Sequence, residues 1–406
     1  MKWKEIIKLK PTVVYGNIDA TPFEVGYDAS RLDMLNKHIQ GLMDDGLIWS
    51  GSYCLWKNGK VFANAAVGNM AEEWQGRSKF LPDTLFELQS VGKIFTAVAI
   101  LKLMEDGILY LGQPVREWIA EFDVDGFKDI TIMQLLTHTS GICALEGTVV
   151  GDDRSWSDFI DEKNPKDSWL NAVVRAGLHA KPGEKWLYSI IGYSVLGEII
   201  ERATGMKAED YIRDSIFVPC EMNKTHWRWQ GTEELVARYN IANETDLQLL
   251  SNAKKSGWKE LAKATYPTYD GIPETAGGQM SNCSEMIHFG KMLLRDGYYN
   301  GKRVIGRNAL EYLWTNLLGE KVNDHTYGKN RPIMYGAGVP IYSKKVDLDK
   351  MLSENTIYHE GAGTCMFLVD REEDFVAMFQ TSFKKEFDWN YRAVMGTASI
   401  IWSGIK

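Results

Sequence analysis

The sequence predicts an α/β (α+β) fold in which one sheet is built from both ends of the chain and helices pack beside it. Strand-like segments occur within residues 51–68 and return after residue 333. The hydrophobic periodicity between them, from about 110 to 230, is mainly helical. At 406 residues, the chain can bury a large core, as one domain or as two. A sheet that joins both ends, with the helical segment packed beside it, is the economical arrangement.

The first part of the chain is predicted to contain a helix, a hairpin and a second helix. Ser30 is suited to cap a helix over 31–46, which carries leucine and isoleucine side chains on one face. The two strand-like runs in 51–68 are joined by Asn58-Gly59, the strongest short signal for a β-hairpin. A helix over 90–107 then begins at Ser90. It is apolar on most sides, which predicts burial in the middle of the molecule.

Further helices and strands follow from the same patterns, while 231–270 is polar and aromatic with little periodicity. Helical spacing predicts helices over 192–205, 208–219, 283–297 and 389–402. Strand-like composition predicts strands over 334–343, 357–363, 364–370 and 374–381.

Composition and charge exclude several classes of protein. Hydrophobic content of 45% and charged content of 25% are ordinary for a soluble globular protein. The net charge of −8 argues against a nucleic-acid-binding surface. The sequence has no apolar stretch long enough to span a membrane, and its start does not resemble a signal peptide. The five cysteines lack C-x-x-C spacing and are expected to be reduced, which favours a cytoplasmic location. The seven histidines form no metal-ligand cluster, so neither a metal nor another cofactor is expected.

Ser90 and Lys93 form a Ser-x-x-Lys pair that can supply a nucleophile and its base. The pattern occurs five times, but only Ser90 leads into a long apolar helix. Lys93 lies on the same helix face, and burial would lower its pKa so that the neutral amine could take the serine proton. The N–H groups of the first turn would stabilise an anion formed beside the hydroxyl. The alternative is a helix-capping serine followed by a lysine that reaches outward to solvent.

The residues around Ser90, "LPDTLFELQSVGKIFTAVAILKLMEDG", resemble the serine β-lactamase family. The similarity is to the class C-like and penicillin-binding-protein-like branch, which includes family VIII-type esterases and D-aminopeptidases. Four later blocks resemble the same family in the same order, so that the resemblance covers about 50 to 380. These blocks lie at 130–142, 181–205, 275–294 and 358–370.

The resemblance implies a β-lactamase/transpeptidase-like fold, with an antiparallel sheet flanked by helices and an all-helical subdomain. The whole chain, 1–406, would then be a single domain. Its sheet subdomain would comprise about 1–85 and 275–406, and its helical subdomain about 90–270.

The resemblance also implies the site residues. Ser90 would be the nucleophile, while Lys93 and Tyr188, the tyrosine of the family's Tyr-x-Asn motif, would move protons. The family's third motif is Lys-Thr-Gly in β-lactamases and His-x-Gly in some esterases and D-aminopeptidases, and it is His359-Glu360-Gly361 in this chain. The backbone N–H groups of Ser90 and Ala362, the latter on the same strand as Gly361, would form the oxyanion hole.

Two positions depart from the β-lactamase pattern. Ile190 replaces the asparagine that would bind an acylamino group, and His359 replaces a lysine that could pair with a carboxylate. Histidine is mostly neutral at pH 7 unless a neighbour such as Glu360 raises its pKa. Both changes weaken the case for penicillins and leave the acyl-transfer residues in place. Ile190, His359, Glu360 and Gly361 are therefore the predicted substrate-binding residues, with further walls expected from 264–278.

Two aromatic residues near the motifs are assigned structural roles. Tyr193 suits the core of the helix that follows Tyr188. His138, in "LLTHTSG", is placed by the resemblance in a structural turn near the site.

Together these features favour a serine hydrolase that forms an acyl-enzyme on Ser90 and acts on a small-molecule ester or amide. One alternative is a D-aminopeptidase, a D-Ala-D-Ala carboxypeptidase or a β-lactamase. Another is a non-catalytic binding protein on the same fold. No nucleic-acid or membrane partner is expected, and the sequence gives no indication of oligomeric state.

Overall fold

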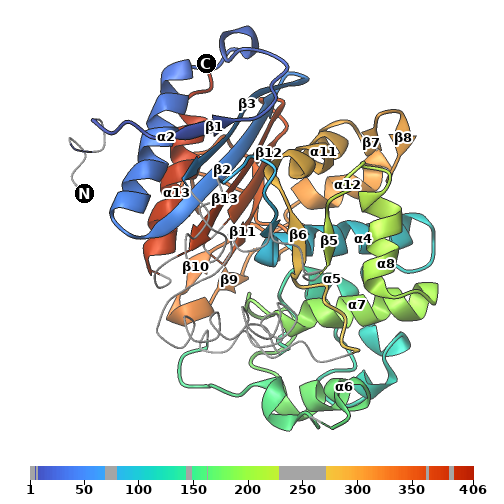
Figure 1. Cartoon of the computed structure of the whole chain (residues 1–406). Helices are drawn as coiled ribbons and strands as arrows, with labels where there is room; N and C mark the ends of the chain where they lie inside the picture. The colour runs from blue at the N-terminus through green and yellow to red at the C-terminus, as the bar shows by residue number, and fades with distance from the viewer. Residues whose placement is uncertain are drawn as a thin grey trace.

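The computed structural model describes residues 5, 8–68, 80–142, 149–161, 163–227, 271–362, 365–383 and 388–406. Its main sheet has six strands in the order β1-β3-β2-β13-β12-β11, and every neighbouring pair is antiparallel (Figure 1). Strands from the start and end of the chain meet at the β2–β13 pair, which confirms the predicted sheet. The strands are β1 (Val13–Tyr15), β2 (Ile48–Lys57), β3 (Lys60–Gly68), β11 (Ile357–Gly361), β12 (Cys365–Asp370) and β13 (Phe375–Phe383).

The hairpin between β2 and β3 forms at the predicted turn. Asn58 has a φ of 50° and Gly59 a φ of 86°. Two successive left-handed residues are what a tight hairpin turn requires, and asparagine and glycine adopt that conformation most easily. Lys57 consequently pairs with Lys60 on the opposite strand.

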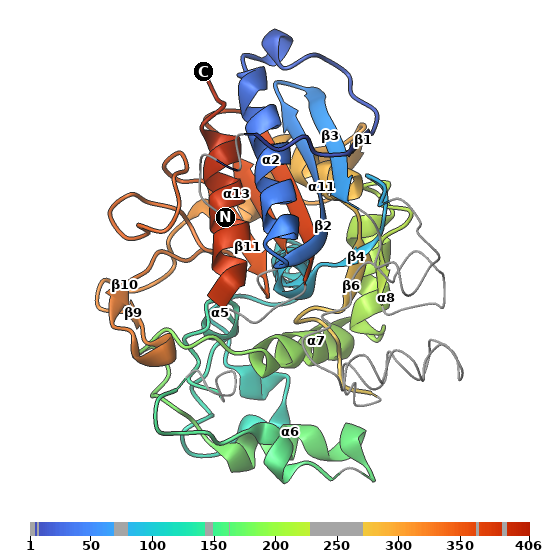
Figure 2. The same cartoon turned by 60° about the vertical axis from the view of Figure 1, so that its left-hand side comes forward.

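Helices cover both faces of the sheet. Helices α2 (Ala29–Asp44) and α13 (Asp388–Trp402) lie side by side on one face, and α11 (Cys283–Leu294) lies on the other (Figures 1 and 2). Strand β12 is apolar at successive positions because alternate residues face different layers. Met366 and Leu368 pack in the core with α2 and α13, whereas Phe367 and Val369 pack in the core with α11.

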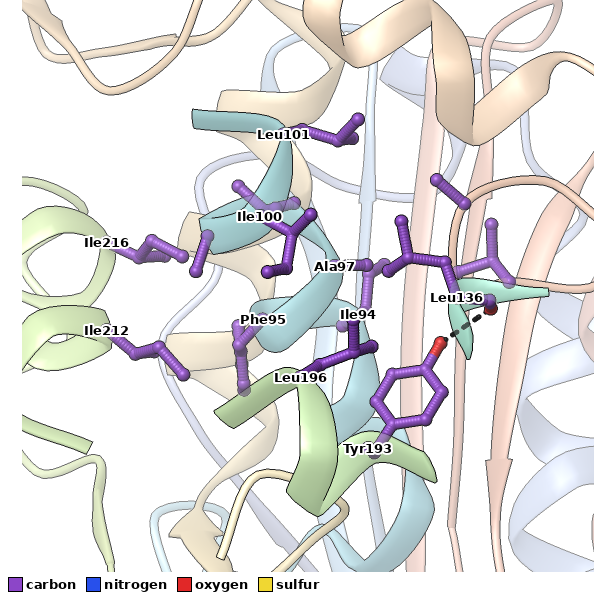
Figure 3. Close-up of a cluster of buried hydrophobic side chains, with 14 of the residues drawn as sticks. Ile94, Phe95, Ala97, Ile100, Leu101, Leu136, Tyr193, Leu196, Ile212 and Ile216 are labelled. Carbon is purple, nitrogen blue, oxygen red and sulfur yellow. Dashed lines mark hydrogen bonds between the residues drawn. The ribbon is translucent and has the colours of Figure 1, made fainter. Parts of the chain in front are cut away.

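Helix α4 (Lys93–Glu105) is the buried centre of the helical part. Ten of its residues are buried, and Figure 3 shows its apolar side chains between those of neighbouring helices. This confirms the burial predicted from its apolar surface. The surrounding helices are α5 (Ile132–Leu136), α6 (Pro165–Ala176), α7 (Ile191–Thr204), α8 (Ala208–Ile212) and α12 (Arg307–Trp314). A π-helical turn, η6 (Arg213–Phe217), continues α8.

Short elements complete the described chain. Three two- or three-residue strands form a second sheet in the order β4-β6-β5, and two further strand pairs are separate. These strands are β4 (Phe86–Glu87), β5 (His226–Trp227), β6 (Gln279–Ser281), β7 (Tyr298–Tyr299), β8 (Lys302–Arg303), β9 (Asn323–Asp324) and β10 (Arg331–Pro332). The 3₁₀ turns are η1 (Phe23–Val25), η2 (Gln89–Gly92), η3 (Val115–Glu117), η4 (Ala120–Phe122), η5 (Trp156–Phe159) and η8 (Thr326–Gly328).

Two local predictions were wrong. Asp28, not Ser30, caps α2: the Asp28 side chain accepts a hydrogen bond from the Ser30 N–H at 3.0 Å. The predicted strand over 334–343 is an irregular segment with isolated bridges only. Pro340, which has no N–H to donate to a ladder, lies within it.

Three further observations concern the described part of the chain. The four cysteines described are buried and form no disulfide bond with one another; Cys143 lies outside the described residues. No helix among the described residues has both the length and the hydrophobicity that crossing a bilayer requires. The same residues contain no group of three or more histidine, cysteine, aspartate or glutamate side chains arranged to hold a metal ion.

Candidate active site

Ser90 lies in the 3₁₀ turn η2 immediately before α4, one turn earlier than the α-helix itself. Gln89, its neighbour, has a φ of 49°, which is unusual for a non-glycine residue and marks a constrained turn. The turn is held from two sides. The Leu88 N–H donates to the Gln279 carbonyl of β6 at 2.8 Å. On the other side, a side chain at Gly361 of β11 would lie 2.5 Å from the Leu88 carbonyl, so only glycine fits there.

Lys93 is fully buried and faces Ser90. Its Nζ lies 3.1 Å from Ser90 Oγ and donates to the Ala276 carbonyl at 2.6 Å. No carboxylate in the described residues pairs with it. Burial therefore lowers the pKa of Lys93 to about 7. The geometry contradicts the alternative of a lysine that reaches outward to solvent.

Tyr188 completes a group of three polar side chains. Its ring lies 4.9 Å from Lys93 Nζ, and its buried hydroxyl has no hydrogen-bond partner of standard geometry among the described residues. Burial raises the pKa of the Tyr188 phenol, and the Ser90 side chain opposes part of that rise. The phenol is consequently protonated at neutral pH.

His138 holds the segment that carries Tyr188. Its Nδ1 accepts a hydrogen bond from the Ser189 N–H at 3.1 Å, and its carbonyl accepts one from the Leu187 N–H at 2.9 Å. The imidazole and Tyr188 rings lie 4.5 Å apart. Burial holds the pKa of His138 well below its usual value, so the ring is neutral. These contacts agree with the structural role inferred for His138.

Tyr193 also lies where the sequence places it. Its side chain is fully buried, and its hydroxyl donates to the Leu136 carbonyl at 2.9 Å (Figure 3). A phenol that is bonded within the core is not available to a substrate. Tyr188, three residues before the start of α7, is therefore the tyrosine at the cavity.

The His359-Glu360-Gly361 motif lies on β11 beside the Ser90 turn. His359 is 4% exposed, and its Nδ1 donates to the Glu360 carbonyl at 2.8 Å. Burial, with a smaller contribution from the nearby Lys93, lowers the pKa of His359 to about 3. The Glu360 carbonyl does raise this pKa, but burial outweighs it, and the Glu360 carboxylate pairs with Lys350 instead. His359 is a neutral imidazole whose Nε2 has no partner among the described residues.

Ala362 and Ile190 are far apart in the sequence but line the same cavity. Ala362 follows β11 in a turn, with a φ of 38°, and is not on the strand as predicted. Ala362 and Ser90 line the same cavity, and the role of the Ala362 N–H in an oxyanion hole stays a prediction. Ile190 is 40% exposed and directly precedes α7, so it offers an apolar surface where the family pattern has an amide.

The cavity at Ser90 has a volume of about 340 Å³. Its lining includes the aromatic wall, which we define as Trp186, Tyr188 and Tyr335, and the ionic wall, which we define as Asp347, Lys350, Tyr358 and Glu360. The sequence did not predict the ionic wall apart from Glu360. Of the expected wall 264–278, residues 264–270 lie outside the described residues, and none of 271–278 lines the cavity. Ala276 in this segment contributes its carbonyl to Lys93 instead.

Lys350 is the centre of the ionic wall. Its Nζ lies 2.8 Å from Asp347 Oδ2 and 3.3 Å from Glu360 Oε1. The Tyr358 hydroxyl donates to the same Asp347 oxygen at 2.7 Å. Burial alone would lower the pKa of Lys350, but the Glu360 and Asp347 carboxylates outweigh burial and the net shift is upward. His359 replaces the lysine of the family's third motif, so a cation was expected to be missing from the site. Lys350 supplies a cation at another position, where it is already paired with two carboxylates.

Comparisons with known proteins agree with this arrangement. The family model described as Beta-lactamase matches residues 35–394. Penicillin-binding protein 4* of Bacillus subtilis (strain 168) is 27% identical over 353 residues, which are 83% of this chain and 72% of that protein. The structure of EstCE1, described as a hydrolase with promiscuous acyltransferase activity, superposes with a TM-score of 0.72 at 17% identity over 92% of this chain and 98% of that one. A family VIII carboxylesterase superposes with a TM-score of 0.68 at 17% identity over 94% and 99%. These structural likenesses confirm the predicted fold.

Proposed function

The chain belongs to the beta-lactamase family, and from that premise we propose that it is a serine hydrolase acting on carboxylic esters or small amides through an acyl-enzyme on Ser90. One observation carries the proposal. Lys93 is fully buried, has no carboxylate partner in the described residues, and lies 3.1 Å from Ser90 Oγ. A lysine whose pKa is about 7 is a base at neutral pH, and a base beside a serine hydroxyl makes a nucleophile.

In the acylation step, Ser90 Oγ attacks the carbonyl carbon while its proton passes to the neutral Lys93 Nζ. The carbonyl oxygen becomes an oxyanion, for which the N–H groups of Ser90 and Ala362 are the proposed donors. Tyr188 then donates its phenolic proton to the leaving alkoxide or amine as the bond to that group breaks. The Lys93 ammonium returns the proton to Tyr188.

In the deacylation step, water attacks the Ser90 ester. A water proton passes to the neutral Lys93, the bond between the acyl carbon and Ser90 Oγ breaks to release the carboxylic acid, and the Lys93 ammonium returns the proton to Ser90 Oγ. The protonation states support this division of roles. Burial raises the pKa of Tyr188 and lowers that of Lys93, so the phenol is the acid and the amine is the base at neutral pH.

The preference for esters rests on what the cavity offers to a β-lactam. Ile190 cannot form a hydrogen bond to an acylamino group, and neutral His359 cannot pair with a carboxylate. Two structures of the same fold are described as a hydrolase with acyltransferase activity and as a carboxylesterase, which supports the ester proposal. The alternatives are a D-aminopeptidase, a carboxypeptidase or a β-lactamase, and comparison of substrates tests the ester proposal against them. Buried cysteines that form no disulfide bond with one another support the proposed cytoplasmic location.

Covalent labelling tests the proposed nucleophile. A fluorescent fluorophosphonate should label the protein, and mass spectrometry should place the adduct on the peptide that contains Ser90. Ser90→Ala should lose the label and all turnover while circular dichroism stays unchanged. A label on another serine would overturn the assignment, and no label at all would favour a non-catalytic binding protein. Rates on 4-nitrophenyl esters, D-amino-acid amides and nitrocefin would then rank the substrate classes.

A further inference from the structure

We propose that the ionic wall is a subsite for a protonated amine carried by the substrate, so that the preferred substrates are amino esters or amino amides. The inference rests on the proposed function and specifies its substrate class. It is drawn from the charges around the cavity and from an unpartnered histidine, which are independent observations.

Carboxylates outnumber cations along the described cavity lining. The four carboxylates (Asp324, Asp347, Asp349 and Glu360) and three cations (Lys329, Arg331 and Lys350) give a net charge of 3 − 4 = −1. Two of the three cations, Arg331 and Lys350, are each shared by two carboxylates. Arg331 contacts Asp324 and Asp349 at 3.1 and 3.4 Å, and Lys350 contacts Asp347 and Glu360. An incoming carboxylate would therefore meet a single unshared cation in the described lining, the half-buried Lys329.

Glu360 is the carboxylate of the ionic wall that is most available to a ligand. Asp347 is 13% exposed and is bound by both Lys350 and the Tyr358 hydroxyl. The Glu360 side chain is 29% exposed, and its contact with Lys350 is longer, at 3.3 Å through Oε1. Its second oxygen makes no hydrogen bond to the described residues. Glu360 can therefore accept hydrogen bonds from a cation while it stays paired with Lys350.

His359 supplies the second observation. Its side chain lines the cavity and is 4% exposed, and its Nδ1 proton is committed to the Glu360 carbonyl. The remaining nitrogen, Nε2, therefore carries a lone pair and can only accept a hydrogen bond. It has no partner among the described residues. A protonated amine combines positive charge with several N–H donors, so it suits a cavity whose lining offers acceptors on both Glu360 and His359.

Two pairs of isosteric esters test the proposal. The first pair is 4-nitrophenyl 3-aminopropanoate and 4-nitrophenyl butanoate, in which an ammonium replaces a methyl on the acyl side. The second is 2-aminoethyl butanoate and propyl butanoate, in which it does so on the alcohol side. Each ratio of kcat/KM is divided by the ratio of the hydroxide-catalysed rates, which removes intrinsic reactivity. We expect the ammonium member of at least one pair to be favoured by about tenfold, the effect of one well-placed charge pair.

Glu360→Gln keeps the shape of the side chain and removes its charge, so it should reduce that ratio at least about fivefold. Glu311→Gln is the matched control. Glu311 pairs with Arg371 at 2.8 Å and is not part of the cavity lining, so this variant should keep the wild-type ratio. A wild-type ratio of one or less in both pairs would overturn the proposal. So would a ratio that Glu360→Gln leaves unchanged.

An inhibition experiment needs no variant. With the wild-type protein and 4-nitrophenyl butanoate as substrate, butylammonium should inhibit competitively at a lower concentration than butanoate. The reverse order would overturn the amine subsite. These outcomes are distinct from failure of the proposed function, in which the fluorophosphonate does not label Ser90 and neither neutral ester is hydrolysed.

Discussion

The cavity brings together two buried lysines whose surroundings differ in one respect. Lys93, beside Ser90, is fully buried and pairs with no carboxylate in the described residues, and its pKa falls to about 7. Lys350, in the ionic wall, is also buried, but two carboxylates lie within 3.3 Å and its pKa rises. Burial alone therefore does not decide what a lysine does. The first becomes a base, and the second stays a fixed charge whose role is to hold the wall together.

Exchanging each lysine for methionine separates these roles and should give the largest effects. Lys93→Met removes the base, so we expect kcat to fall by about 10²–10⁴ with a smaller change in KM. Lys350→Met leaves Asp347 and Glu360 without their cation. It should lower the free energy of unfolding by on the order of 2–4 kcal/mol, after allowing for the exposed part of Glu360. Steady-state kinetics on both variants measure kcat and KM, and urea unfolding measures the free energy of unfolding.

The two lysine substitutions should change the free energy of unfolding in opposite directions. The folded pKa of Lys93 lies below its ordinary value of 10.5, so the folded state resists protonation there. The resulting penalty is fully present below about pH 7, declines as the pH rises towards 10.5, and is absent above it. Lys93→Met should therefore stabilise the protein at pH 6 but not at pH 11. If Lys93→Met instead destabilised the protein at pH 6, as Lys350→Met should, the inferred difference between the two lysines would be contradicted.

Tyr188→Phe tests whether the aromatic wall shares in proton transfer. Loss of the phenol should lower kcat by about 10²–10⁴ for esters with poor leaving groups. The loss should be smaller for 4-nitrophenyl esters, because nitrophenolate needs no proton to leave. Comparing ethyl and 4-nitrophenyl butanoate in the same variant measures this difference. An equal loss on both substrates would assign Tyr188 to packing or to the attack step alone.

The Ser90–Lys93 pair and the ionic wall also differ in how far the sequence predicted them. Ser90 and Lys93 are three residues apart at the start of one apolar helix, so helical geometry alone brings them together. The ionic wall joins Asp347 and Lys350, from an irregular segment, to Tyr358 and Glu360 on β11. Charged residues in a segment without periodicity are typical of a solvated loop, and nothing in the local sequence indicates that Lys350 is buried.

Fold prediction shows the same limit. The Asn58-Gly59 hairpin and the buried α4 depend on local conformational preference and on hydrophobic pattern, and both were correct. The strand predicted over 334–343 was wrong because β propensity is overridden where Pro340 interrupts a ladder. The position of Ala362 depends on where β11 ends, and strand ends are set by the turn that follows rather than by the strand's own residues.

Ile190 and His359 should decide the preference between an ester and a β-lactam substrate. We expect kcat/KM for 4-nitrophenyl butanoate to exceed that for nitrocefin by at least about a hundredfold, since two polar groups of the β-lactam would meet mismatched partners. Ile190→Asn restores an amide at the cavity and should narrow this gap. Comparable rates on the wild-type protein would show that Ile190 and His359 do not set specificity, and a β-lactamase or peptidase function would then replace the proposed one.

The effect most specific to Lys93 is the pH dependence of the rate. Since Lys93 must be neutral to accept the serine proton, kcat/KM on a neutral ester should fall about tenfold for each pH unit below about 7. Burial raises the pKa of Tyr188 above its ordinary value, so the rate should stay level from about pH 8 to 10. The Lys350 ammonium stays charged throughout and should add no step. A full profile from pH 4 to 10, with enzyme stability checked at each pH, measures this. An acid limb centred well below pH 7 would instead identify a carboxylate as the base. Burial raises the pKa of Glu360 above its ordinary value, so a limb between that value and pH 7 would point to Glu360 and would transfer the role of base to the ionic wall.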